Sequence, residues 1–515
     1  MARWLWLCFG LACTCACGDG APPADGGGPG AELGFLLVDA DSYELSGTRL
    51  ASSPTRLFYN FHPAERDAHE APLLVVTAGG PGSAVSLLTA WNTGPTTVSL
   101  EAGGQLVSNP NALTRFANVL YVDARNAGFS YSWLPDPSDP EARALAFSLA
   151  NYNVYRDAAD VLTVLLAFFE HHPALAANPT FLVGESYGAL RNTVLLNLLL
   201  FGPTGVGAVE HFASPALLDR ISEHLRAWVG DPRPSPERIA ALFPGQILLE
   251  PALAGSLQME ISGALFEEPG SEVDRIAAEH GVEYVRCADR PPPCDAYVNA
   301  RELLVSLDRS PYDLRRPADF LEAGLERTME TLSRLDALAQ VLGVPRGSLQ
   351  AALATREPGT YRFADPGQAL STPEGDLGAS IGPLPVWDAY LMAVNLDVTR
   401  AFASSAVADH AAAVTTTSLG ELFLQNLRQV RTFVSRGAYD LVAYGPAVAP
   451  TLRALPGVED VVPAYDDGEL EVRFDDGLVR TLSSPEYASS HFVTLDAAEA
   501  LGRDLGRFLT APAPP

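Results

Sequence analysis

A serine between two glycines stands in the segment TFLVGESYGALRNT, residues 180–193. The apolar run before Ser186 predicts a buried strand, and the leucine-rich stretch directly after it predicts a helix. Because Gly184 and Gly188 are small, strand and helix can crowd together and push the serine oxygen out of a tight turn. The bare pattern is common, since glycine and serine are frequent residues, so its weight comes from the strand and helix around it. Together they predict a nucleophile for acyl transfer.

A serine hydroxyl is a poor nucleophile unless a histidine takes its proton and a carboxylate orients that histidine. Where the nucleophile sits on such a turn, the acid and then the histidine follow it along the chain. Five histidines lie downstream of Ser186. His491, in EYASSHFVTL, follows a short strand pattern and precedes the last predicted helix, which is where a general base belongs. The other four lie in helical patterns, where a solvated or packing histidine is the simpler interpretation: His211, His224, His280 and His410.

Asp440 is the candidate acid. It stands in FVSRGAYDLVAYGP, after a predicted buried strand and a glycine turn. A side chain in this place would orient His491 if the two loops meet. The alternative interpretation of Asp440 is a helix cap.

Short apolar runs bounded by turn residues alternate with longer periodic stretches, which predicts an α/β fold with a mostly parallel sheet flanked by helices. Leu73–Thr77 and Asn118–Asp123 are expected strands, and Asp157–Glu170 is an expected helix. Amphipathic helical patterns with few strand signals predict a helical cap inserted between two parts of the sheet domain. The expected boundaries are a first core part over 32–208, the cap over 209–385 and a second core part over 386–511.

The charge balance limits the partners. The chain has 34 basic and 62 acidic residues, a net charge of −28, and all of its basic residues are arginine. A protein with this much negative charge repels phosphate backbones and anionic membranes. We therefore expect no nucleic-acid partner. The composition does not indicate an oligomeric state.

The first residues resemble an export signal. Arg3 precedes an apolar run from Trp4 to Ala16, which is too short to span a bilayer. The end of this run resembles a bacterial lipoprotein signal, residues 1–17, with Cys17 as the lipidated residue; Cys13 is an alternative, and so is simple secretion. The glycine- and proline-rich residues 18–31 predict a flexible tether. We therefore expect an exported protein that meets a membrane only through an N-terminal lipid anchor.

Two cysteines remain in the body of the chain, Cys287 and Cys294, in the segment CADRPPPC. In an oxidising compartment this spacing suits one disulfide that closes a short loop. A metal site would need further ligands nearby, and the neighbouring residues do not supply them. We expect no metal and no cofactor.

Five dispersed segments resemble the serine carboxypeptidase family, in the order in which that family carries them: AGGPGSA (78–84), NPNALTRFANVLYVDARNAGFSYS (109–132), GESYGAL (184–190), RGAYDLVAYGP (436–446) and SSHFVTLDAAEALGRDLGRFL (489–509). The resemblance covers the sheet domain and leaves the cap unmatched. It implies an α/β-hydrolase fold with Ser186, Asp440 and His491 as the catalytic triad. It also implies an oxyanion hole formed by the backbone N–H groups of Gly80 and Tyr187.

The resemblance places substrate binding at Gly79, Glu185 and the position of Asn92. Two departures stand out. Family members bind a free C-terminal carboxylate with an asparagine where this chain has Ala78. They also pair the glutamate before the nucleophile with a second glutamate, and here that partner position is Asn92. The residues therefore support the hydrolytic chemistry more strongly than the carboxypeptidase specificity.

The leading hypothesis is hydrolysis through an acyl-enzyme on Ser186. The bond cleaved would be the C-terminal peptide bond of a peptide or a related acyl bond. Ala78 and Asn92 motivate an alternative, an esterase or acyltransferase on the same fold. A third hypothesis, from another class, is a catalytically idle surface lipoprotein that uses its cap for binding. The substrate under the first two is a peptide or an ester.

Overall fold

The computed structural model describes residues 30–133, 139–146, 148–310, 312–317, 320–332, 334–354, 416–464 and 468–511. The expected export signal with Cys17 and all but the last two residues of the expected tether lie outside the described residues. His410 lies outside them as well.

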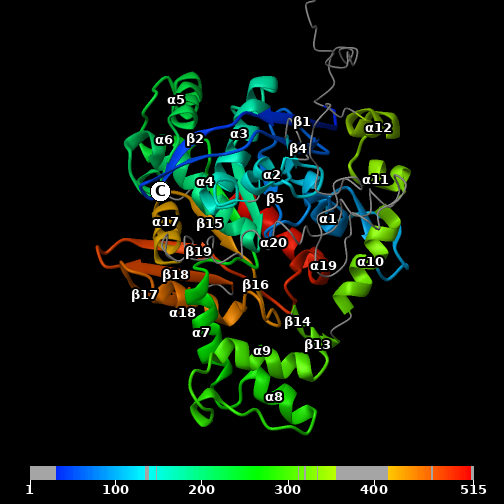
Figure 1. Cartoon of the computed structure of the whole chain (residues 1–515), viewed down its shortest axis with the longest axis vertical. Helices are drawn as coiled ribbons and strands as arrows, with labels where there is room; N and C mark the ends of the chain where they lie inside the picture. The colour runs from blue at the N-terminus through cyan, green and yellow to red at the C-terminus, as the bar shows by residue number, and fades with distance from the viewer. Residues whose placement is uncertain are drawn as a thin grey trace, which may run out of the picture.

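One large sheet runs through the centre of the protein (Figure 1). Its six middle strands run parallel, and its outer strands join antiparallel. From edge to edge the strands are β1 (Glu32–Val38), β4 (Thr55–His62), β8 (Asn118–Val122), β5 (Leu73–Thr77), β10 (Thr180–Glu185), β12 (Gly245–Leu249), β15 (Arg431–Val434), β19 (Val479–Ser483), β18 (Glu469–Phe474) and β17 (Val458–Pro463), with β9 (Tyr131–Ser132) beside β4.

Both faces of the central strands are buried, which explains their uninterrupted apolar sequences. In β5, Leu73 and Val75 pack into one core with α3 (Val154–His171) and α4 (Tyr187–Phe201). Leu74 and Val76 face the other way and pack into a second core. That second core also holds α1 (Val85–Leu88) and α20 (Ala498–Thr510). The expected fold class, a mostly parallel sheet between layers of helices as in α/β-hydrolases, is confirmed.

Further helices complete the two layers and the connections. They are α2 (Pro140–Ala146), α5 (Pro215–Val229), α6 (Pro236–Ala240), α17 (Thr416–Gln429), α18 (Val448–Arg453) and α19 (Val493–Asp496). Short strands pair outside the large sheet: β2 (Ser42–Leu45) with β3 (Thr48–Ala51) and β11 (Phe212–Ala213), β6 (Thr96–Ser99) with β7 (Gln105–Ser108), and β16 (Arg436–Gly437) with β20 (Glu486–Tyr487).

The expected cap over 209–385 is wrong at its start. β12 lies inside that range yet is a central strand of the sheet, and Leu217, Ile221 and Leu225 of α5 pack into the core beside α3 and α4. The cap begins only after β12. Its helices α7 (Ser256–Phe266), α8 (Glu272–Glu279) and α9 (Ala296–Ser306) form the lower end of the molecule in Figure 1. A five-residue segment such as GQILL, with three large apolar side chains, does not distinguish a strand from a piece of helix, which is why the sequence missed β12.

After the cap the chain returns to the sheet domain. The hairpin of β13 (Arg309–Ser310) and β14 (Asp313–Pro317) leads to α10 (Phe320–Leu332), α11 (Leu335–Val341) and α12 (Arg346–Ala354). Leu332 and Leu338 of these helices pack in one core cluster with Trp91 and Phe58. The sequence also predicts these helices as part of the cap over 209–385. Their apolar face instead covers the sheet domain.

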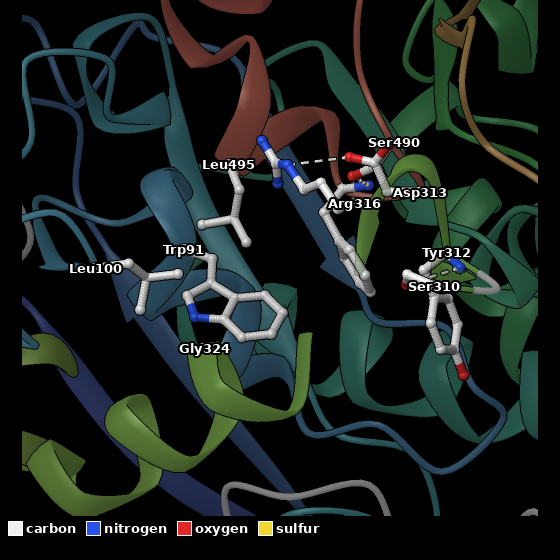
Figure 2. A pocket seen from close by; sticks show the side chains of 10 residues that line it. Trp91, Leu100, Ser310, Tyr312, Asp313, Arg316, Gly324, Ser490 and Leu495 are labelled. Atoms are coloured by element: carbon white, nitrogen blue, oxygen red, sulfur yellow. Dashed lines mark hydrogen bonds and ion pairs between the residues drawn. The ribbon is translucent and has the colours of Figure 1, made fainter. Parts of the chain in front are cut away.

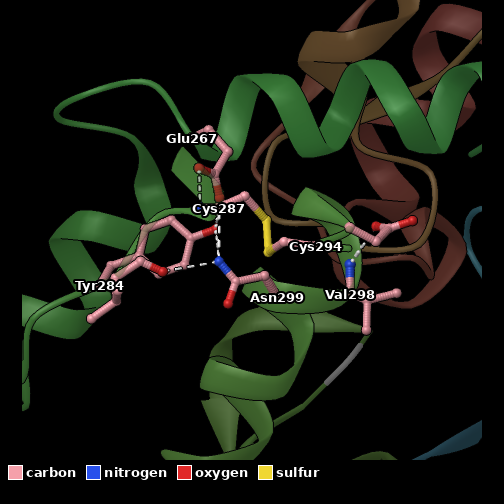
Figure 3. The surroundings of a disulfide bond; sticks show 8 residues. Glu267, Tyr284, Cys287, Cys294, Val298 and Asn299 are labelled. Carbon is pink, nitrogen blue, oxygen red and sulfur yellow. Dashed lines mark hydrogen bonds between the residues drawn. A yellow bond between two sulfur atoms is a disulfide. The ribbon is translucent and has the colours of Figure 1, made fainter. Parts of the chain in front are cut away.

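The strands β18 and β19 form an antiparallel pair, and β19 also joins the large sheet. The expected disulfide is confirmed. In the cap, Cys287 and Cys294 form a disulfide with a Cα–Cα distance of 5.4 Å (Figure 3). Glu267 holds the loop, because its carboxylate accepts hydrogen bonds from the Cys287 N–H at 2.8 Å and the Tyr284 hydroxyl at 2.6 Å.

None of the helices in the described part of the chain has both the length and the apolar composition needed to cross a bilayer.

Candidate active site

Ser186 occupies a sharp turn between β10 and α4. Its φ of 53° and ψ of −120° lie in a region that L residues rarely adopt. The strand and the helix meet so closely that a Cβ on Gly184 would lie 2.3 Å from the carbonyl oxygen of Gly188. A larger residue than glycine would therefore open the turn. The predicted setting of Ser186, after a buried strand and at the start of a helix, is confirmed.

Asp440 and His491 meet because two short parallel strands carry them to the same place. β16 and β20 pair side by side, Asp440 follows three residues after β16, and His491 follows four residues after β20. The Asp440 Oδ2 and His491 Nδ1 atoms are 2.8 Å apart. The other carboxylate oxygen accepts from the backbone N–H groups of Val442 at 2.8 Å and Ala443 at 3.0 Å. The carboxylate is thus fixed on both sides, and one oxygen is left for the imidazole.

Both partners are buried: Asp440 is 0% and His491 4% exposed. Burial by itself lowers the pKa of His491, but Asp440 and then Glu185 oppose it, and the net pKa is raised above its ordinary 6.5. The charged imidazolium is therefore favoured in this position, as a general base requires after it has taken a proton.

The Nε2 side of the same ring faces Glu185, the residue before the nucleophile. Glu185 Oε1 lies 3.8 Å from His491 Nε2, and Glu185 Oε2 accepts the Gly79 N–H at 2.8 Å. Burial raises the pKa of the Glu185 carboxyl, although His491 and the Gly79 N–H act against that rise. No hydrogen bond joins the Ser186 hydroxyl to His491 among the described residues. Such contacts are often long in the absence of substrate.

The residues expected to form the oxyanion hole flank the nucleophile. The Gly79 backbone lies against Ser186, since a Cβ on Gly79 would be 2.7 Å from the Ser186 Cβ. Gly80 follows with a φ of 103°, and its N–H has no hydrogen-bond partner in the described part of the chain. Tyr187 is the first residue of the 15-residue helix α4, whose N-terminal end favours developing negative charge.

A buried arginine supports this glycine loop from behind. Arg191 Nη1 donates to the Ala78 carbonyl oxygen at 2.7 Å, and Arg191 Nε donates to the Asp157 carboxylate at 2.8 Å. Arg191 is 1% exposed. Arg191 was not predicted from the sequence as a residue of the site. Its position in α4, five residues after the nucleophile, is a signal that it lies next to the turn.

No hydrogen bond joins Asn92 to Glu185 in the described part of the chain. Asn92 adopts a left-handed φ of 64°, and its backbone N–H donates to Thr97 Oγ1 at 3.2 Å. Ala78 is buried in the core at 3% exposure. The two departures from the carboxypeptidase pattern therefore remain departures in three dimensions.

A pocket that was not predicted from the sequence is lined by Ser490 and Phe492, the two residues on either side of His491 in the chain (Figure 2). Trp91 lines the pocket as well, and the centroids of the Trp91 and Phe492 rings are 5.5 Å apart. Tyr312 lines another side, and its backbone carbonyl accepts the His491 N–H at 3.0 Å. The wall is mainly aromatic and apolar.

The pocket also has a cationic side chain, Arg316, that is held in place by two carboxylates. Arg316 Nε lies 3.1 Å from Asp313, and Arg316 Nη2 lies 2.8 Å from Asp496. These residues come from β14 and α19, so segments that lie far apart in the sequence build the pocket. Such a site has no local sequence motif by which it could be recognised.

The described residues contain no group of three or more His, Cys, Asp or Glu side chains arranged to hold a metal ion.

Comparison with known proteins gives a consistent family. A family model described as serine carboxypeptidase matches residues 48–191. Serine carboxypeptidase-like 49 of Arabidopsis thaliana is 32% identical over 164 residues, which cover 32% of this chain and 28% of that protein. Carboxypeptidase sxa2 of Schizosaccharomyces pombe is 31% identical over 171 residues, or 32% of this chain and 31% of that protein. The aligned segments thus span about a third of this chain and less than a third of those relatives.

Among solved structures, this chain is similar to Kex1(delta)p, a prohormone-processing carboxypeptidase from Saccharomyces cerevisiae. The match has 14% sequence identity and a TM-score of 0.44, and covers 93% of this chain and 91% of the other.

Proposed function

We propose that the protein is a serine hydrolase that cleaves peptide or related acyl bonds through an acyl-enzyme on Ser186, and the match of residues 48–191 to the serine carboxypeptidase family model supports this proposal. The aligned region holds the nucleophile and the glycine loop, whereas Asp440 and His491 lie beyond it. The roles of the last two residues are therefore argued from geometry.

In this mechanism His491 Nε2 takes the proton of the Ser186 hydroxyl as the oxygen attacks the substrate carbonyl. The same nitrogen then gives the proton to the leaving amine or alcohol, and the acyl group stays on Ser186. A water molecule, activated by the same ring, releases the acyl group in the second half of the reaction. Asp440 fixes the ring through Nδ1 and stabilises the imidazolium that forms twice per turnover.

The tetrahedral intermediates carry a negative oxygen, and we assign the N–H groups of Gly80 and Tyr187 to stabilise it. Loss of one such donor typically costs about 2.7–4 kcal/mol of transition-state stabilisation. Glu185 holds the glycine loop by accepting the Gly79 N–H, and so it acts on the position of Gly80.

The observation that carries the proposal is the 2.8 Å hydrogen bond between Asp440 and His491, formed by a ring whose other nitrogen faces the residue next to Ser186. A fluorophosphonate probe tests it directly. We expect the probe to label Ser186 of the folded wild-type protein and to leave Ser186→Ala unlabelled. Unlabelled wild-type protein, or equal labelling of both, would contradict the proposal.

An esterase or acyltransferase is the second candidate, and the residues Ala78 and Asn92 favour it, because they stand where family members carry an asparagine and a glutamate. Ala78 has no polar side-chain group with which to bind a free C-terminal carboxylate. A panel of free-carboxylate peptides, blocked peptides and small activated esters separates the two candidates. Carboxypeptidase activity releases C-terminal amino acids, whereas the second candidate turns over esters and leaves peptides intact.

We further propose that the protein is exported and lipidated at Cys17. The disulfide of Cys287 and Cys294 supports an oxidising compartment. Metabolic labelling with a fatty acid, compared between the wild type and Cys17→Ser, tests the anchor. If lipidation is at Cys13, the label persists in the Cys17 variant and is lost in Cys13→Ser. If the protein is simply secreted, neither protein carries label.

A further inference from the structure

Glu250 lies at the edge of the sheet where the active site is built. It directly follows β12, the strand between the one that leads to Ser186 and the one that leads toward Asp440. The Ser186 N–H donates to the carbonyl oxygen of Leu249 at 2.8 Å, and the Glu250 N–H donates to Ser435 Oγ at 2.9 Å. Because the three strands are parallel, their carboxyl ends meet here, and the Glu250 backbone connects the nucleophile turn to the acid loop.

The Glu250 side chain is unusual in its burial and its lack of partners. It is 0% exposed, and neither carboxyl oxygen has a hydrogen-bond partner among the described residues. Its φ of 41° is a conformation that costs energy for a residue with a side chain. A buried carboxylate without hydrogen bonds is strongly disfavoured, so a group kept in this state calls for a specific explanation.

The groups around Glu250 explain its charge state. Burial, then the carboxyl groups of Asp440 and Glu185, raise the pKa of Glu250 well above its ordinary 4.5, against the opposing effects of the Ser435 hydroxyl and the Val493 N–H. A neutral carboxylic acid has one donor and one carbonyl acceptor, which suits neighbours of both kinds.

We propose that Glu250 is a positioning residue of this site: an uncharged carboxylic acid that supports the loops of Asp440 and His491 without placing another negative charge beside the imidazole. Val493 follows His491 by two residues, and Ser435 precedes the loop of Asp440, so the buried Glu250 side chain lies close to both loops without a hydrogen bond of ordinary geometry to either. This inference rests on the proposed function for its catalytic consequence, but the protonation of Glu250 is a property of the resting protein.

Infrared spectroscopy tests the protonation without any turnover. A protonated carboxyl group has a C=O stretching band that a carboxylate lacks. We expect a band of the folded wild type, at neutral pH, that disappears in Glu250→Gln. Absence of a difference band would overturn the proposal, even if Ser186 were labelled by a fluorophosphonate. Failure of that labelling would remove the proposed function and leave the band unchanged, so the two failures are distinguishable.

Kinetics tests the positioning role. Glu250→Gln keeps the shape and neutrality of the side chain, so we expect kcat within about threefold of the wild type. It should also leave the acid limb of the pH–rate profile in place, because no charge is removed. Glu250→Ala leaves the loops unsupported, and we expect kcat to fall at least tenfold with little change in KM. Because glutamine also fills the space, Glu250→Met, whose side chain has a similar length and no polar end, separates positioning from space filling: we expect its kcat to fall as in Glu250→Ala, and a retained kcat would overturn the proposal.

A matched control separates this effect from loss of stability. Gln246 is also on β12 and 0% exposed, but it lies near the opposite end of the strand. Gln246→Ala should lower the unfolding temperature as Glu250→Ala does, yet leave kcat of the folded protein unchanged. A movement of the acid limb toward lower pH in Glu250→Gln would show that Glu250 is ionised and overturn the proposal. An unchanged kcat in Glu250→Ala would overturn it too.

Discussion

Two buried clusters of charged residues lie near each other in this protein and are compensated in opposite ways. In the first, named here the arginine cluster, Arg125 and Arg156 both bind the Asp160 carboxylate, and Arg191 binds Asp157. In the second, named here the carboxyl cluster, Asp440, Glu185 and Glu250 surround the single imidazole of His491. The first cluster has a guanidinium for each carboxylate, whereas the second has three carboxyl groups and one titratable base.

The pKa directions follow this difference at Asp160, whereas burial leaves the pKa of Asp157 raised despite its ion pair with Arg191. Burial by itself raises the pKa of Asp160, but Arg125 and Arg156 outweigh it and hold that pKa below its ordinary 3.8. In the carboxyl cluster, burial and like charges raise the pKa of Glu250 and leave that of Glu185 raised as well. Fixed ion pairs hold a structure together, while groups that change charge near neutral pH can move protons. The comparison therefore separates a structural cluster from a chemical one.

The largest effect is expected in the carboxyl cluster. Asp440→Asn removes the charge that stabilises the imidazolium and favours the wrong tautomer of His491. We expect kcat to fall by on the order of 10⁴-fold, with the fold retained. Steady-state kinetics beside circular dichroism measures both quantities. A loss of less than about tenfold would mean that Asp440 caps its loop and does not serve the histidine.

The next largest effect is expected on stability. Asp160→Asn leaves two buried guanidinium groups without their shared carboxylate, and breaking such a pair costs about 3–5 kcal/mol of unfolding free energy. Urea unfolding measures the loss. The comparison holds if the protein that remains folded keeps its kcat, and it breaks if kcat falls as far as in the Asp440 variant.

Arg191 connects the two clusters, since it binds Asp157 on one side and the Ala78 carbonyl oxygen on the other. Arg191→Met should lower stability and also lower kcat, by about 10²-fold if the glycine loop shifts by about 1 Å. Fluorophosphonate labelling rates of the folded protein provide the second measurement. If stability falls and kcat stays, the loop does not depend on Arg191 for its position.

The smallest effect is a change of pH dependence. Glu185 is one of the groups that raise the pKa of His491. Because the base is active only when its imidazole is neutral, kcat/KM should rise with pH, with an apparent pKa above the ordinary histidine value. Glu185→Gln removes that carboxylate and lowers the pKa of His491. The acid limb of the kcat/KM profile should therefore move to lower pH. A limb that stays in place, or moves to higher pH, would show that Glu185 does not act on His491 through its charge.

The sequence alone was sufficient for the residues whose chemistry depends on local pattern. Ser186 could be found from its strand and helix, and His491 from its place before the last helix. β12 was missed because its short run, with only three large apolar side chains, fits a strand and a helix equally well. Glu250 was missed with it, since its role depends on strand neighbours that only the sheet order reveals. The aromatic pocket escaped for the same reason: Trp91, Tyr312 and Phe492 come from three distant segments.

At one border of the large sheet the outermost strand is β17. An outermost strand offers a row of backbone donors and acceptors on which another molecule can build. β17 carries Glu459 and Asp460 along this border and ends at Pro463, which has no N–H to offer. We expect these charges and this proline to discourage strand addition there, so that concentrated protein stays dispersed on this side.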